Sequence, residues 1–516
     1  MREFFAAAVE RESPEAWRAG HQRLFEYLTT TTTPHRPDTL EGLEPLYQAV
    51  AHGCKAGLHE KALDDVYVDR ILRGTGYDGF YSTRKLGAFG AGLGAVANFF
   101  MDAAWREPSP NLSPSTQAWL LNEAAFLLRA LGRLLEALAP MRMGMEMAVE
   151  QEDWRNAAIY ANHLSQLELT LGWISQAVDD GEQSVTFADK SGNALERMAR
   201  RIAYADRLHQ AGDREQVRAL FQAAEEIQAK DQSEYLRLYS LQDFRYCELL
   251  LAEAEQAAWW TWMKRAIAGN GWAVGWTSAP GTQPPTGAAV DAPSRSYPPY
   301  GPGIVPGTPN AAGQEFDELI AECDRVTARA TQLFEWRKLP QWNPAADSIL
   351  HIALDHLTLA RARLYRGLLA GDLVTGAPRP PAPAQGVARD AIKVHLTAAV
   401  AGLRKSGHSD HLPRGLLTRA WYRAVIRDPA GARADLDEAW EIATGGSMAL
   451  FQADILLTRA RLFGVGAVTG DEEGRAAEGY PWASVAADLT AARRLIEKHG
   501  YHRRDRELAD AEGGLG

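Results

Sequence analysis

The feature that most constrains the fold is a spacing of 40 residues that recurs in the middle of the chain. Gly132, Gly172 and Gly212 are 40 residues apart, and residues of similar character recur at fixed distances from each of them. A spacing of this size is typical of repeat proteins, in which each unit stacks on its neighbours to bury its apolar face. The other recurring positions are Ala125, Ser165 and Ala205, then Ala137, Ala177 and Val217, and then Gly144, Ser184 and Ala224.

Each unit has the pattern of a helical hairpin. Apolar residues recur with helical periodicity before each glycine, for example over 121–131 and 157–171. Glycine suits the left-handed residue that ends a helix, because a Cβ atom is disfavoured in that conformation. The small residues are expected where two helices come close, because a bulky side chain would overpack the contact. We therefore predict an all-α fold, a right-handed superhelical solenoid of antiparallel helical hairpins.

The last third of the chain repeats the pattern. Residues 416–421 (LLTRAW) recur 40 positions later as 456–461 (LLTRAR). Residues 268–314 hold nine prolines and nine glycines in 47 positions, a composition that blocks helices and central strands. Five consecutive threonines at 29–33 also predict a loop. The predicted organisation is an N-terminal helical region at 1–110, a hairpin block at 111–267, a linker or loop at 268–314 and a second hairpin block at 315–516.

Composition excludes several classes of partner. The chain has 516 residues, with 55 Lys and Arg against 66 Asp and Glu, and so a net charge of −11. This balance argues against a general nucleic-acid surface, which carries a basic face. The uncharged, largely apolar stretch 86–101 has 16 residues, fewer than the ~20 that span a bilayer. Three widely separated cysteines fit a reducing compartment. We therefore expect a cytoplasmic protein without a membrane or nucleic-acid partner.

The sequence lacks the familiar motifs of catalytic and cofactor sites. The glycine-rich segment 87–94 is followed by no Lys-Ser/Thr pair, as a phosphate-binding loop requires. His408 and His411 have no further metal ligand at compact spacing. Cys54 lies two positions from His52, which puts the two side chains on different faces of a helix. We therefore predict that the chain is not an enzyme and has no catalytic residue, cofactor or metal.

The remaining candidate for function is the concave face of the stacked hairpins, which is the usual binding face of a solenoid. Asn122 and Asn162 occupy equivalent repeat positions, and an asparagine amide both donates to and accepts from a peptide backbone. The basic run at 493–506 is instead expected to be a solvated cap. The predicted protein-binding residues are Asn122, Phe126, Arg129, Ile159, Asn162, Gln166, Asp206 and His209.

The order small–Gly–Ala–aromatic–small, with Phe221 and Ala224 as its last members, resembles the tetratricopeptide repeat (TPR). The usual TPR unit has about 34 residues, so these units have longer helices or connections. The segments 35–57 and 119–189 are similar to the C-terminal sensor regions of bacterial signalling NTPases of the NACHT type. This resemblance implies the sensor part of a bacterial defence or signalling assembly, associated with an NTPase or protease effector.

The expected function is thus a non-enzymatic scaffold that binds a protein or peptide. One alternative is a regulatory or adaptor subunit of an enzyme, with the active site on a partner chain. A third interpretation is a regulator that holds a small molecule near Trp272 and Trp276 in the proline-rich segment.

Overall fold

In a computed structural model of the chain, every regular element of the described residues is a helix. An isolated antiparallel bridge between Phe100 and Pro108 is the extent of β-pairing in this part of the chain. The all-α prediction is confirmed. The structure describes residues 9–76, 78–231, 234–235, 237–267, 309–343, 347–373, 383–467 and 480–515. Most of the predicted linker, with Trp272 and Trp276, lies outside them.

The helices fall into three consecutive groups along the chain. The N-terminal group consists of α2 (Pro14–Thr31), α3 (Leu40–Lys55), α4 (His59–Lys61), the π-helix η1 (Ala62–Leu72), α5 (Tyr81–Leu86), α6 (Phe89–Val96) and the 3-10 helix η2 (Ala97–Phe99). The middle group consists of α7 (Pro114–Ala130), α8 (Leu134–Glu150), α9 (Trp154–Leu171), α10 (Ile174–Ser191), α11 (Ala194–Ala211), α12 (Arg214–Asp231), α13 (Ser240–Leu250) and α14 (Ala252–Ile267). The C-terminal group consists of α15 (Pro309–Trp336), α16 (Ile349–Leu369), α17 (Pro383–Ser406), α18 (Leu412–Val425), α19 (Pro429–Gly445), α20 (Ala449–Ala467), α22 (Val485–His499), the 3-10 helix η3 (His502–Arg504) and α23 (Asp505–Leu515).

The turn glycines end helices as predicted. Gly132, Gly172 and Gly212 have φ angles of 79°, 86° and 90°, in the left-handed region that favours glycine. The residue after each glycine donates a backbone hydrogen bond to a carbonyl of the preceding helix, at 2.8 to 2.9 Å. Small polar residues begin two of the helices: Asp153 accepts from the backbone of the first turn of α9, and Asn193 does the same for α11.

Consecutive helices pack in pairs, α7 with α8, α9 with α10 and α11 with α12, and each pair also contacts the next. The predicted small residues lie in these contacts. A Cβ atom on Gly144 would lie 3.0 Å from the carbonyl oxygen of Ala118 and 3.3 Å from the backbone nitrogen of Asn122. Ser184 is buried and donates to the carbonyl of Ala158 at 3.0 Å. These contacts explain why the positions hold small side chains.

This close contact leads to a stability prediction. Gly144→Leu is expected to lower the free energy of unfolding by about 1–3 kcal/mol, because the new side chain meets the backbone of α7. The matched control is Gly94→Leu, since Gly94 lies in helix α6 with nothing within 4 Å of its Cβ position. Leucine there should be neutral or stabilising by up to about 1 kcal/mol. Urea denaturation of both variants checks the prediction, and equal destabilisation would contradict it.

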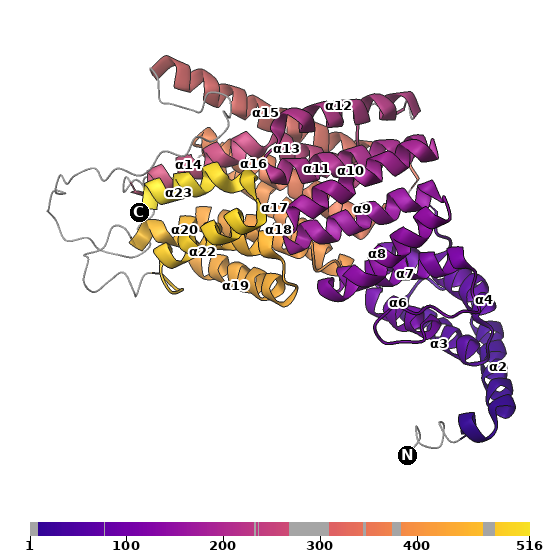
Figure 1. Cartoon of the computed structure of the whole chain (residues 1–516). Coiled ribbons are helices and arrows are strands. Elements are labelled where there is room, and N and C mark those ends of the chain that lie inside the picture. Colours follow the sequence, from indigo (N-terminus) through magenta and orange to yellow (C-terminus); the bar gives the residue numbers. More distant parts are fainter. Residues whose placement is uncertain are drawn as a thin grey trace.

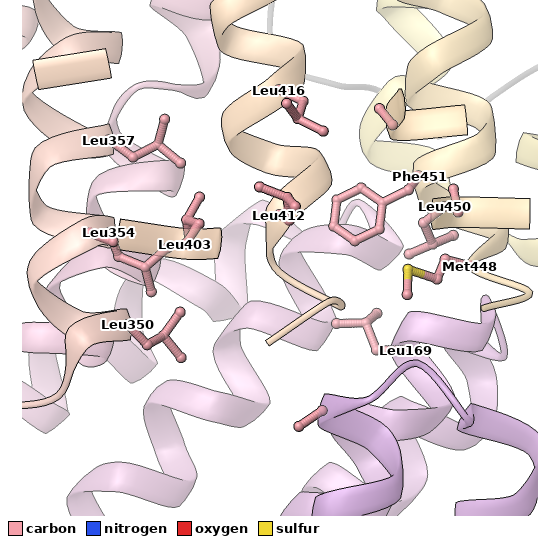
Figure 2. Close-up of a cluster of buried hydrophobic side chains, with 14 of the residues drawn as sticks. Leu169, Leu350, Leu354, Leu357, Leu403, Leu412, Leu416, Met448, Leu450 and Phe451 are labelled. Atoms are coloured by element: carbon pink, nitrogen blue, oxygen red, sulfur yellow. The ribbon is translucent and has the colours of Figure 1, made fainter. Parts of the chain in front are cut away.

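The C-terminal helices lie against the middle group (Figure 1). Helix α20 contacts α9, and η3 contacts α11. Ser409 donates both its hydroxyl and its backbone N–H to the carbonyl of Ala130, at 2.8 and 2.9 Å. Figure 2 shows the apolar part of this contact, where Leu169 of α9 lies beside Met448 and Leu412. One hydrophobic core runs from Phe25 to Leu515 and includes residues of all three groups.

Two expectations about helix ends are wrong. Helix α2 extends into the predicted threonine loop as far as Thr31, and Thr32 and Thr33 lie outside it. The hydroxyls of Thr30 and Thr31 each donate to the carbonyl four residues earlier, at 2.7 Å, which ties the side chains back to the helix. Helix α15 begins at Pro309, inside the predicted linker. Proline is tolerated there because the first turn of a helix needs no backbone N–H donor.

Candidate functional site

The predicted concave-face residues are not free in this structure. None of the eight is exposed, and Asn122, Arg129, Gln166, Asp206 and His209 are buried. The neighbours of these five belong to the same chain, so a partner could reach them only after the neighbours moved away, whereas Phe126, Ile159 and Asn162 stay partly exposed. Their role in binding a partner stays a prediction.

Several of these side chains have specific partners within the chain. Asn122 Oδ1 lies 2.9 Å from His163 Nδ1, and Arg129 lies 3.6 Å from Asp410, in the turn before α18. The ring of Phe126 packs against those of Phe89, His163 and His408. Two elements, α13 and the turn before α18, thus supply contacts to the face on which we expected a peptide. Arg245 of α13 donates to Gln166 at 2.7 Å and lies 3.6 Å from Asp206.

Beside this face lies a cavity of about 80 Å³, which we call the central cavity. Helices α9, α11, α13, α14, α16, α18 and α20, together with the segment 501–504, contribute to its wall. Of the predicted binding residues, Gln166 is in the wall. The charged residues of the wall are Arg361, Arg414, Arg461, Arg503, Arg504, Glu248, Glu255 and Asp454, and its aromatic residues are Trp259, Tyr365, Trp421, Phe451 and Tyr501.

Glu248 links two arginines on one side of the central cavity. Its carboxylate accepts from Arg361 at 2.9 Å and from Arg414 at 3.1 Å. Burial by itself would raise the pKa of Glu248, but the charges of Arg414 and Arg361 outweigh it and hold the pKa well below its usual range. The carboxylate is therefore ionised at neutral pH, and the three side chains form a buried ion-pair cluster.

The opposite side of the central cavity comes from the segment that we predicted to be a solvated cap. Arg503 and Arg504 both pair with Glu255, at 3.1 and 3.2 Å, and Arg504 also pairs with Asp454 at 2.8 Å. Their side chains retain only 7% and 10% of their exposure. The cap prediction is wrong for these two residues, because they fold inward and join the C-terminus to α14 and α20. Arg493 does lie on the surface, where it pairs with Glu512.

Arg461 of α20 is the most buried arginine of the wall, with 3% of its residue surface exposed. Its Nη1 atom pairs with Glu507 at 2.8 Å, and its guanidinium lies 5.0 Å from the ring centroid of Trp259. Trp259 in turn stacks on Trp421, with ring centroids 3.5 Å apart. Sequence reasoning missed this residue, although one signal was present. Arg461 falls 40 positions after Trp421, so a charged residue stands where the preceding unit has an aromatic one.

A second, larger depression lies on the outside of the molecule. It has a volume of about 600 Å³ and is formed by the turn after α9, the start of α10 and the segment 498–502. Trp173 contributes to it with 37% of its surface exposed. The charged and imidazole side chains that line this depression are those of Asp179, Lys498, His499 and His502. We call this depression the Trp173 groove.

The three cysteines are buried, and His408 and His411 pack against each other. Burial raises the pKa of Cys54 and of Cys323 to about 12, and it raises that of Cys247 further, so these thiols stay protonated at neutral pH. The rings of His408 and His411 pack edge to face, with centroids 5.8 Å apart. In the described ranges, no group of three or more His, Cys, Asp or Glu side chains has the arrangement of a metal site.

Comparison with known proteins gives no family for the chain, because neither a family profile nor a curated sequence matches it. Among the helices that the structure describes, none is long and apolar enough to cross a bilayer.

Proposed function

We propose that this chain is a non-enzymatic recognition module of the cytoplasm, which binds a protein or peptide partner as the sensor part of a bacterial signalling or defence assembly. The paired helices with left-handed glycines at their ends support a TPR-like solenoid as its scaffold. The resemblance of the segments 35–57 and 119–189 to NACHT-type sensor regions supports the sensor role.

The observation that carries the binding role is the Trp173 groove. Trp173 follows the turn glycine Gly172, and the carbonyl of that glycine lies 2.8 Å from His499 Nδ1. The groove is thus held between the middle and C-terminal groups of helices. Tryptophan is enriched among the residues that dominate interface energies, because it buries a large surface with little loss of side-chain freedom. A half-exposed tryptophan in a concave site is therefore a suitable anchor for an apolar side chain of a partner.

Replacement of Trp173 by alanine is expected to weaken partner binding by at least about tenfold, the loss of a typical interface hot spot. The partner is first identified as the protein that the wild-type chain retains in stoichiometric amounts from a bacterial lysate. Its dissociation constant is then measured against both forms by calorimetry.

The matched control is Leu135→Ala, which removes an exposed apolar side chain of α8 (58% exposed) outside the groove. This variant should bind the partner as the wild type does. Equal affinity of the Trp173→Ala variant and the wild type would refute the groove as the binding site.

A further inference from the structure

The wall of the central cavity has more cationic than anionic groups. Five arginines face three carboxylates, those of Glu248, Glu255 and Asp454. Glu507 stands behind the wall and pairs with Arg461 and Arg504. Even with this fourth carboxylate, one positive charge is in excess. A buried charge is costly unless an opposite charge compensates it, so the cavity favours an anion.

The unsatisfied hydrogen-bonding atoms of the wall also favour an anion. Among the described residues, four buried wall atoms have no hydrogen-bond partner, and all four are donors. They are Nε and Nη2 of Arg461, Nε of Arg414 and Nε1 of Trp421. Buried donors without an acceptor cost free energy. A group with several acceptor oxygens would satisfy them once these side chains turn toward the cavity, since a guanidinium presents its donors in a fork that matches a phosphate or carboxylate.

The size of the central cavity limits the ligand. A volume of about 80 Å³ holds several water molecules or one group the size of phosphate. The four donors belong to three side chains of α18 and α20. A phosphate has more acceptor oxygens than a carboxylate, and therefore more directions in which it accepts. Arg361 and Arg414 retain 15% and 19% of their side-chain exposure, so solvent-sized groups reach the wall.

We propose that the central cavity binds a phosphate group, either inorganic phosphate or a small phosphate monoester, through Arg461, Arg414 and Trp421. This site is separate from the Trp173 groove and requires no protein partner. Because the wall combines α9 and α11 with the C-terminal helices, the bound anion stabilises their contact. A ligand that binds only the folded chain also raises its melting temperature.

The test is calorimetric titration of the full chain with sodium phosphate, in a chloride buffer of matched ionic strength. We expect saturable binding with a Kd of about 1 mM or tighter, together with a rise in melting temperature. Arg461→Gln should weaken binding by at least about tenfold, because it removes a charge-assisted contact. Arg493→Gln, on the surface, is the matched control and should bind as the wild type does.

Two further measurements keep the proposal testable if Arg461→Gln does not fold. Trp421→Phe keeps an aromatic ring but removes the indole donor, and it should weaken phosphate binding by about threefold or more. Methyl phosphate distinguishes the source of the phosphate: a site for a monoester should bind it at least as tightly as inorganic phosphate, whereas a site for free phosphate should bind it more weakly. Absence of saturable binding to the wild-type chain would overturn the proposal. Wild-type affinity in a folded Arg461→Gln variant would also overturn it.

Discussion

Replacement of Glu248 by glutamine is expected to lower the free energy of unfolding by about 3–5 kcal/mol, the usual effect of removing one partner from a buried ion pair. Glu248 keeps 7% of its side-chain exposure and is the shared partner of Arg361 and Arg414. Glutamine has nearly the same shape but no charge, so two largely buried guanidinium groups would lose their common counter-charge. Urea denaturation at neutral pH measures the effect.

The chain offers a matched control in Glu253, which pairs with Arg214 at 3.1 Å but keeps 65% of its side-chain exposure. Exposed pairs of this kind contribute about 0–1 kcal/mol, so Glu253→Gln should unfold almost as the wild type does. If both variants lost the same free energy of unfolding, burial would not explain the contribution of the Glu248 cluster to stability.

Acidification from pH 7 to pH 5 is expected to destabilise the chain through His209 and His411. Both are buried. Burial, assisted by Arg414 and opposed by Asp410, lowers the pKa of His411 to about 3. Burial and Arg503 lower the pKa of His209 well below its ordinary value. In the unfolded chain both titrate near 6.5, so below this pH the unfolded state binds protons that the folded state does not. Each histidine then costs about 2 kcal/mol of stability at pH 5.

Buried carboxyl groups act in the opposite direction, so the wild-type pH profile is a sum of both effects. Burial raises the pKa of Glu123 and of Asp355 to about 7. Such groups are protonated in the folded state before they are in the unfolded state, which adds stability as the pH falls from 7 to 5. The prediction therefore concerns the difference in free energy of unfolding between the wild type and a variant. The stability gap between the wild type and a His209→Gln, His411→Gln double variant should shift by about 4 kcal/mol between pH 7 and pH 5, in favour of the variant.

The control for this experiment is Leu416→Ala, which empties a fully buried position in α18, the helix that directly follows His411, without changing a titratable group. It should cost about 2–5 kcal/mol, and its stability difference from the wild type should not depend on pH. A histidine double variant whose gap to the wild type is also constant would show that these two side chains are not kept neutral by the fold.

Local features of the fold could be predicted from the sequence. Gly172 ends a helix because its φ of 86° disfavours any residue with a Cβ atom. Gly144 lies at a close helix contact because backbone atoms of α7 leave no room for a side chain. Helical periodicity, turn glycines and small contact residues are all set by neighbours within about one hairpin, and a single sequence records them directly. The loop prediction is wrong at Thr30 and Thr31, because their hydroxyls donate hydrogen bonds to carbonyls of the preceding turn and fit the helix.

The candidate site depends on contacts that no local pattern records. Glu248 is 113 residues from Arg361 and 166 residues from Arg414. Sequence alone predicts that an arginine is solvated, because it does not show a partner that is distant in the chain. For this reason the sequence places Arg503 and Arg504 on the surface. Likewise, the positions of Arg129 and Gln166 on their helices follow from the repeat. The side chains that cover them, from α13 and the turn before α18, do not.

The sequence by itself therefore determined that this chain folds into helical hairpins, and where their turns and close contacts lie, because those properties depend on backbone conformation and on residues near in the chain. Only the tertiary structure decided which faces remain open. Contacts from α13 and from the turn before α18 cover part of the expected peptide-binding face, and packing of the C-terminal helices against the middle group places five arginines around the central cavity. It leaves Trp173 half exposed in an outer groove. Burial and charge pairing between distant segments are properties of the packed chain, and they set both the groove and the anion site.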